Sequence, residues 1–352
     1  MVPRAALPLL AVVVAGCGSA APDELPPAAE PAVSPRPAAA PDGRVVSVGL
    51  KPEGVAADAR TGLVAVGLRG PDRLVLVDGT TGAVTRRVAL PAAPRHLALA
   101  APGGPVLVPA EDADRLIAVD LPGGGTSGAP TGRKPHDAAA AGSRIFVADE
   151  LADRLTVLRD GRSLASIETA LQPGGLAPLD RGRKVAVVSV RERVVEVFDA
   201  GTAERTGRAP AGVGPTHAVS DGGDYLFVTD TAGGALLVYH LRPRLELIRR
   251  YPLPGSPYGI AIDNRRHRMY VTQTGRNQLS ELIVGGRPSL VRRYSTPRQP
   301  NTVAVDERSG RVFVAGKVDG VLQLLDPGRE RTRYSAPATA NRTALTSSQR
   351  AA

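Results

Sequence analysis

The stretch PYGIAIDNRRHRMYVTQ (residues 257–273) decides the fold, because its pattern recurs along the chain. A proline heads a segment of small apolar residues, and a polar turn and an apolar strand follow. Six other segments share this head: PEGVAAD (52–58), PRHLALA (94–100), PHDAAAA (135–141), PGGLAPL (173–179), PTHAVSD (215–221) and PNTVAVD (300–306). Successive heads are 38 to 43 residues apart, so the chain contains seven repeats of similar length.

The repeat length fits one four-stranded blade of a β-propeller. A third apolar strand follows each head and its partner strand, and a fourth is visible between most repeats, as in VTRRVAL (84–90) and LELIRRY (245–251). Each blade buries its two faces against its neighbours, and the ring closes on itself. We therefore predict an all-β protein, a seven-bladed β-propeller of four-stranded antiparallel blades, over residues 43–335.

Two segments could supply the outer strand of the last blade. Residues 44–48 (RVVSV) precede the first head, and residues 331–335 follow the last repeat. Residues 44–48 stand ahead of Pro52 in the register that the fourth strands occupy ahead of later heads. We therefore expect this N-terminal strand to complete the last blade and close the ring.

The heads, together with IFVAD (145–149), LFVTD (226–230) and MYVTQ (269–273), resemble the YVTN-type β-propeller repeat family. That family is similar to the lactonase-like seven-bladed propellers. The resemblance covers residues 43–335 and implies the propeller fold. It implies no activity by itself, because the motif residues are mostly packing and turn residues.

The N-terminus reads as a bacterial lipoprotein signal. Arg4 precedes an apolar stretch that ends in VAGC (14–17), which resembles a lipobox, and Cys17 is the only cysteine. We expect residues 1–16 to be a signal peptide and Cys17 to be the lipidated residue of an exported protein. Membrane lipid is then the first partner, at the outer face of the bacterial plasma membrane.

Two segments have compositions that cannot bury a core. Residues 17–42 begin with the lipidated cysteine and are rich in Ala and Pro, which favours an extended stalk. About 25 such residues at roughly 3 Å each could hold a domain up to about 75 Å from the bilayer. Residues 336–352 are predicted to be a disordered tail.

Composition excludes several classes of protein. The chain has 3% aromatic residues and no Trp, which argues against propellers that mark each blade with a tryptophan. Its net charge is +10, but the basic residues are scattered and not interleaved with aromatics, so nucleic acid is not a favoured partner. A cell-wall polymer or a surface protein is a partner that an anchored propeller could reach.

The loops entering the innermost strands are where propellers usually hold ligands. Three of the five histidines directly follow a head proline or lie one residue further. The candidate ligand-binding residues at the channel mouth are Glu53, His96, His136, Asp137, His217, Tyr258 and Asn301. A second set of loops adds charges of mixed sign to the same face: Arg69, Glu111, Asp112, Glu150, Arg191, Arg193, Arg276 and Lys317.

The mouth histidines allow two interpretations. His96, His217 and either His136 or Asp137 could converge as metal ligands, although no local pair such as H-x-H supports this. The alternative is that each histidine hydrogen-bonds the backbone of a neighbouring blade. Aspartates six residues after four heads (Asp58, Asp221, Asp263 and Asp306) are interpreted as turn residues and not as a ring of carboxylates.

No catalytic residue can be assigned. The chain has no G-x-S-x-G elbow, H-E-x-x-H pair or P-loop, and no cofactor is predicted apart from a metal ion that the mouth histidines could hold. The favoured function is an extracytoplasmic binding or scaffolding module. The alternative is a lactonase-like or metal-dependent hydrolase, which would need Glu53, His96, Asp137 and His217 to form one site.

Overall fold

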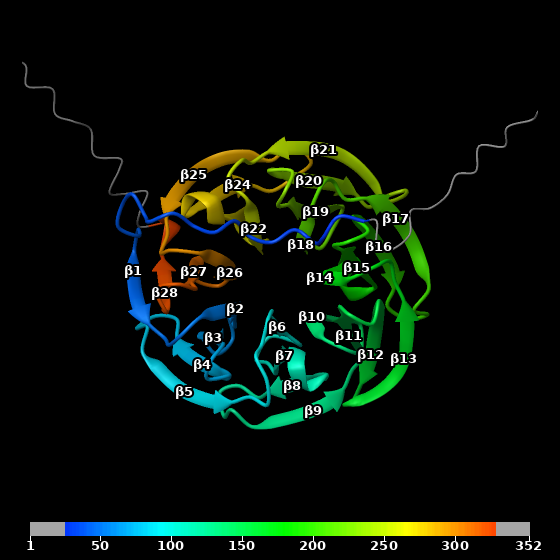
Figure 1. Ribbon diagram of the computed structural model, residues 1–352, viewed down its shortest axis with the longest axis horizontal. Coiled ribbons are helices and arrows are strands. Elements are labelled where there is room, and N and C mark those ends of the chain that lie inside the picture. Colours follow the sequence, from blue (N-terminus) through cyan, green and yellow to red (C-terminus); the bar gives the residue numbers. More distant parts are fainter. Residues whose placement is uncertain (1–24, 329–352) are drawn as a thin grey trace, which may run out of the picture.

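The computed structural model describes residues 25–328, which form seven four-stranded antiparallel sheets around a common axis (Figure 1). The seven-bladed propeller predicted from the repeats is confirmed. The predicted signal peptide, Cys17 and the predicted C-terminal tail lie outside these residues. Among residues 25–328, no helix is both long enough and apolar enough to cross a bilayer.

Each blade contributes its strands in chain order from the axis outwards, and the last blade borrows its outer strand from the N-terminus. The strands are β2 (Pro52–Ala57), β3 (Leu63–Leu68), β4 (Arg73–Asp78) and β5 (Val84–Ala89) in blade 1; β6 (Ala98–Leu99), β7 (Val106–Ala110), β8 (Arg115–Val119) and β9 (Thr126–Pro130) in blade 2; β10 (Pro135–Ala141), β11 (Arg144–Asp149), β12 (Arg154–Arg159) and β13 (Arg162–Glu168) in blade 3; β14 (Pro173–Leu179), β15 (Lys184–Ser189), β16 (Val194–Asp199) and β17 (Arg205–Pro210) in blade 4; β18 (Pro215–Ser220), β19 (Tyr225–Asp230), β20 (Ala235–His240) and β21 (Glu246–Pro252) in blade 5; β22 (Pro257–Asp263), β23 (Arg268–Gln273), β24 (Gln278–Ile283) and β25 (Ser289–Ser295) in blade 6; and β26 (Pro300–Asp306), β27 (Arg311–Gly316), β28 (Val321–Leu325) and β1 (Arg44–Ser47) in blade 7. Short 3-10 turns stand at Glu111–Ala113, Asp180–Gly182 and Thr274–Arg276.

The hydrophobic core lies between the blades. Seven clusters of buried side chains are present, and each joins two neighbouring blades. The second and third strands are almost wholly buried, whereas outer strands such as β5 and β21 carry mainly exposed polar side chains. Valine, alanine and leucine fill most of the interior, and the four phenylalanines and three of the tyrosines are fully buried among them.

The ring closes as predicted, through β1. It pairs antiparallel with β28 from Arg44 opposite Leu324 to Ser47 opposite Val321. Val48, just past the strand, is only 2% exposed and packs in the cluster between blades 7 and 1. The competing segment, residues 331–335, lies outside the described residues.

Residues 28–42, which we call the N-terminal strap, lie against the face of the ring that carries the head prolines (Figure 1). Ser34 is 1% exposed. Its Oγ donates to the carbonyl of Thr274 at 2.6 Å, and its backbone N–H donates to Gln299 Oε1 at 2.9 Å. An extended stalk is predicted for residues 17–42; within the strap, loops of the ring bond the backbone of Ala32, Ser34 and Pro35, so this part of it lies along the ring.

Candidate functional site

The first two residues after each head proline reach the channel because the ladder is interrupted there. In six blades the pairing between the innermost and second strands shifts register directly after the head. In blade 2 the head Pro94 makes only an isolated bridge to Ala110, and β6 starts four residues later. Such bulges redirect side chains at the rim of a sheet. We call this face of the ring, with its head loops and the loops between second and third strands, the mouth.

Three histidines from separate blades meet at the axis below the mouth. His96 Nε2 and His217 Nε2 are 3.0 Å apart, and the rings of His96 and His136 have centroids 4.8 Å apart. The ring of His217 packs edge-on against Tyr258 at 4.5 Å. Four of the predicted mouth residues are thus in direct contact, although their sequence positions span blades 2 to 6.

The histidine pair is neutral around pH 7. Burial, followed by the nearby His136 and Arg95, lowers the pKa of His217 to about 3. Burial and the neighbouring His217 also hold the pKa of His96 well below its usual value. One imidazole must therefore donate its N–H to the other ring nitrogen, and the pair forms a polar layer that carries no charge.

A cavity of about 210 Å³ lies in the channel beneath this layer and extends toward the opposite face. His96, His217 and Asp137 line it together with aliphatic side chains such as Val219 and Ile260. Asp137 accepts the backbone N–H of Leu176 at 2.8 Å, and burial raises the pKa of its carboxyl to about 6. His217 Nδ1 is buried and has no hydrogen-bond partner in the described part of the chain. We call this space the central chamber.

Above the histidines, the buried Glu53 carboxylate contacts two residues of blade 7, Asn301 and Lys317. Its Oε1 accepts from Asn301 Nδ2 at 2.9 Å, and its Oε2 lies 2.5 Å from Lys317 Nζ. Burial alone would raise the pKa of Glu53, but the Lys317 charge and hydrogen bond hold it below the ordinary value. Glu53 and Asn301, two of the candidate mouth residues, therefore lie together. Their polar groups bond to each other and to Lys317, so the Glu53 carboxylate already has protein partners.

Arg95 is the cation at the centre of the mouth. Burial would lower its pKa, but the combined influence of Tyr258, Glu111, Glu53 and Glu30 raises it. Its Nη1 lies 3.9 Å from Glu111, and its Nη2 lies 3.8 Å from Glu30 of the strap. The buried Nε has no hydrogen-bond partner among the described residues. The guanidinium thus makes long ion pairs and a side-chain hydrogen bond with Tyr258, and its Nε donor is unused.

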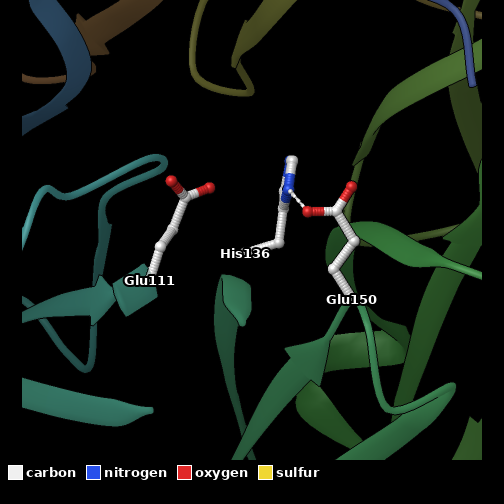
Figure 2. Close-up of side chains that lie close together, drawn as sticks. All are labelled: Glu111, His136 and Glu150. Atoms are coloured by element: carbon white, nitrogen blue, oxygen red, sulfur yellow. Dashed lines mark hydrogen bonds and ion pairs between the residues drawn. The ribbon is translucent and has the colours of Figure 1, made fainter. Parts of the chain in front are cut away.

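One set of three metal-type side chains occurs within residues 25–328: Glu111, His136 and Glu150, whose ligand atoms lie within 4.8 Å of one another (Figure 2). His136 Nδ1 is 3.0 Å from Glu150 Oε2, and Gln172 Nε2 donates to Glu150 Oε1 at 2.9 Å. Burial opposes ionisation, but the hydrogen bond and charge of His136 lower the pKa of Glu150 to about 2.

Cations already neutralise part of this set. Arg69 Nη2 lies 2.8 Å from Glu111 Oε2, and Lys134 Nζ lies 3.9 Å from the same oxygen. Glu111 Oε1 is buried without a hydrogen-bond partner in the region described. The donor set of two carboxylates and one imidazole fits a divalent ion. Such an ion would compete with Arg69 and Lys134 for Glu111.

The set differs from the metal ligands expected from the sequence. Of His96, His217, His136 and Asp137, only His136 belongs to it. Glu111 and Glu150 stand at the ends of β7 and β11, and the sequence showed them only as rim charges with no histidine partner. Their distance of 25 and 14 residues from His136 offers no local motif, so only the ring geometry could reveal the cluster.

The aspartates interpreted as turn residues are confirmed in that role. Asp58 Oδ2 accepts from the backbone and the hydroxyl of Thr61, and Asp58 Oδ1 accepts the Gly103 N–H of the next blade. Asp221, Asp263 and Asp306 likewise accept hydrogen bonds from residues two to four positions ahead. They lie at the turns between first and second strands, away from the mouth.

Glycines make room for the bulky residues of the channel. At the second position after the head, blades 1, 4 and 6 carry Gly54, Gly175 and Gly259. A Cβ on Gly175 would lie 2.7 Å from the Thr216 carbonyl oxygen and 2.9 Å from His217 Cα. Each of these glycines faces the corresponding backbone of the next blade, so close approach at the axis requires the missing side chain.

Substitution of Gly175 tests this packing. Gly175→Ala is expected to lower the free energy of unfolding by about 1–3 kcal/mol, the usual cost of overpacking. Urea unfolding measures the loss, and Gly123→Ala is the matched control because a Cβ there meets nothing within 4 Å. Equal unfolding midpoints for the two variants would show that blades 4 and 5 can move apart around the added methyl group without lowering the free energy of unfolding.

Comparisons with known proteins establish the architecture. No family model matches the chain, and no curated protein matches it. Hydrazine synthase of Kuenenia stuttgartiensis is similar in structure, with a TM-score of 0.70 at 15% identity over 81% of this chain and 98% of that one. Virginiamycin B lyase of Staphylococcus aureus has a TM-score of 0.65 at 14% identity over 80% and 99%. A chain of the mitotic checkpoint complex has a TM-score of 0.69 at 12% identity over 90% and 98%.

These likenesses show a seven-bladed propeller. At 12 to 15% identity they carry the fold alone, and the three proteins have unrelated roles. The resemblance to YVTN-type repeats stays a prediction.

Proposed function

We propose that this protein is a surface-tethered, extracytoplasmic binding module whose ligand occupies the central chamber. In this proposal, Cys17 anchors the chain in the outer face of the bacterial plasma membrane. The propeller supplies a rigid ring, and the channel residues supply the recognition. Cell-wall components and surface proteins are the partners within reach of such an anchor.

The chamber is the observation that carries this proposal. Its walls are mostly aliphatic, and its polar side chains are two neutral histidines, the Asp137 carboxylate and Thr302, whose hydroxyl donates to the Glu53 carbonyl. Ligand sites combine an apolar lining with a few convergent polar groups in this way. A buried ring nitrogen that lacks a partner among the described residues, His217 Nδ1, is a free hydrogen-bonding position. The chamber therefore suits a small ligand with an apolar body and a neutral hydroxyl or amide group.

Ligand-observed NMR tests this chemistry. The soluble mature chain carrying Cys17→Ser is titrated with benzyl alcohol, benzamide and benzoate. We expect the alcohol and the amide to bind and benzoate to bind more weakly, because Asp137 repels a carboxylate. Ala140→Phe, which fills the chamber, should abolish binding, and Leu164→Phe at a 49% exposed position of the outer strand β13 should not. Absence of binding by all three probes would contradict the proposal.

A metal-dependent hydrolase or lyase is the second candidate, favoured by Glu111, His136 and Glu150. These three residues would hold the ion, and a divalent ion bound there would lower the pKa of a coordinated water. Glu150 is already ionised, since its pKa is about 2, and Gln172 orients it. The hydrolase site expected from the sequence included Glu53, which Lys317 and Asn301 occupy instead.

Elemental analysis separates the two candidates. The chain is purified without a chelator or a histidine tag, alongside His136→Ala and the His96→Ala, His217→Ala double variant. About one equivalent of metal that persists in the double variant and disappears in His136→Ala would establish the metal site. No metal in any of the three proteins would leave the binding module.

A further inference from the structure

The position of the N-terminal end of the strap on the ring limits the orientations that the propeller can take on a membrane. Ala28 packs against the cluster between blades 4 and 5, and a Cβ on Gly214 of the same face would lie 2.7 Å from Ala29. From there the strap runs across the mouth to blade 7 (Figure 1). The described part of the chain therefore first contacts the ring on its mouth side, at blades 4 and 5.

The strap is held by hydrogen bonds along its length. Besides the bonds of Ser34, the Ala32 N–H donates to Ser256 Oγ at 3.1 Å, and Asn277 Nδ2 donates to the Pro35 carbonyl at 2.9 Å. Gln299 Nε2 donates to the Ala32 carbonyl at 3.0 Å. This attachment fixes the strap on the mouth, so the distance to an anchored Cys17 is set by the residues before Ala28 only.

That distance is short. Ala28 is eleven residues along the chain from Cys17, and a fully extended chain of that length spans at most about 40 Å. A lipid-anchored Cys17 thus keeps Ala28 within about 40 Å of the bilayer. The spacer of about 75 Å estimated from composition does not form, because the residues of the strap lie along the ring.

The same face carries exposed aliphatic side chains at its loop tips. Exposed fractions are 65% for Leu50, 45% for Leu151, 52% for Val213, 54% for Val318 and 85% for Val33 of the strap. The other exposed large aliphatics of the described chain lie on outer strands, except Ile283 at the opposite face. The mouth thus exposes five large aliphatic side chains, and the opposite face exposes one.

Cations accompany two of these tips. Leu50 is followed by the exposed Lys51, and Arg133 Nε and Nη2 donate to the Leu151 carbonyl at 3.1 and 2.5 Å. An aliphatic side chain beside a lysine or arginine matches the boundary between acyl chains and anionic headgroups. A protein partner would not explain why the anchored N-terminus and the tips share one face.

We infer that the mouth lies on the outer surface of the phospholipid bilayer, with the loop tips of Leu50, Leu151, Val213 and Val318 at the headgroup boundary. The central chamber then opens away from the membrane, toward the wall. This inference rests on the lipid tether of the proposed function and adds an orientation to it.

Single-cysteine labelling tests the orientation. Because Cys17 is acylated in the mature lipoprotein, an introduced cysteine is the one reactive thiol. Leu151→Cys and Val318→Cys report on the mouth, and Ile283→Cys, of similar exposure at 42%, reports on the opposite face. Each variant is labelled with bimane and reconstituted in vesicles of phosphatidylglycerol and phosphatidylethanolamine that contain headgroup-nitroxide lipid.

We expect several-fold stronger quenching at positions 151 and 318 than at position 283. Equal quenching at all three positions, or stronger quenching at 283, would overturn the orientation. Flotation of the unlabelled parent with the vesicles, compared with Cys17→Ser, tests the tether separately. Flotation of the parent but not of Cys17→Ser supports the tether. If the protein then binds the vesicles but shows no quenching difference, the orientation is refuted and the tether is not.

Discussion

Deletion of residues 43–50 is expected to lower the melting temperature by about 10 °C or more. The deletion removes β1, which pairs with β28 over four positions, and the buried Val48. It also exposes β28 as an unpaired edge in the last blade. The Val48 N–H bond to the Gly320 carbonyl at 3.1 Å is lost with them.

The size of the effect follows from the buried groups. Burial of one valine is worth about 1.5–3 kcal/mol, and the lost strand pairing adds to it. Each kcal/mol moves the melting temperature of a domain of about 150–250 residues by roughly 2–4 °C. Scanning calorimetry of the deletion variant and the parent measures the difference.

A substitution on the same strand provides the control. Val45 is 38% exposed, so Val45→Ala should shift the melting temperature little. A deletion variant that melts at the temperature of the parent would mean that another segment, such as residues 331–335, can close the ring.

Lys317→Met is expected to have the second largest effect. It leaves the Glu53 carboxylate, 3% exposed, in the channel without its ion partner. Removing one partner of a buried pair costs about 3–5 kcal/mol, and we expect the lower end because Lys317 is 34% exposed. Urea unfolding measures the cost, and Lys317→Arg, which keeps the charge, is the control.

The loss should depend on pH. In the parent, the pKa of Glu53 is lowered from 4.5, so its contribution is present above pH 4.5 and disappears as the pH falls through the lowered value. In Lys317→Met burial predominates and raises the pKa, so protonation relieves the penalty in acid. The difference between the two proteins should be largest near pH 7 and shrink as the pH falls, first through the raised pKa of the variant and then through the lowered pKa of the parent. A difference that is constant over this range would mean that Lys317 acts through packing and not through its charge.

The repeats predicted the architecture because blade packing is encoded locally. Each head and each apolar strand carries its own periodicity, so the count of blades, the closing strand and the turn aspartates such as Asp58 could be read directly. The convergence of His96, His136 and His217 at one face was also predictable, since the head positions of all blades share one end of the channel.

The partners of those residues could not be predicted. Whether His96 meets His217 or a metal depends on distances across the axis, which no local pattern encodes. Glu111 and Glu150 joined His136 only through the ring geometry. The attachment of the strap to the ring could not be predicted for a related reason. Ala and Pro predict an extended chain, but composition does not reveal that Gln299 and Asn277 bind it.

The spacing of the channel glycines has a consequence for symmetry. A ring in which small and bulky residues alternate needs an even number of members, and this ring has seven. The alternation at the second position after the head proline therefore fails once around the ring. It fails at blades 2 and 3, where His96 and Asp137 are neighbours with no glycine between them. The adjoining inner strand, β6, is reduced to two residues at this point, and Glu111 and Glu150 flank it. Because the number of repeats is odd, one pair of neighbouring blades, 2 and 3, differs from the others. The cluster of Glu111, His136 and Glu150 lies at this pair.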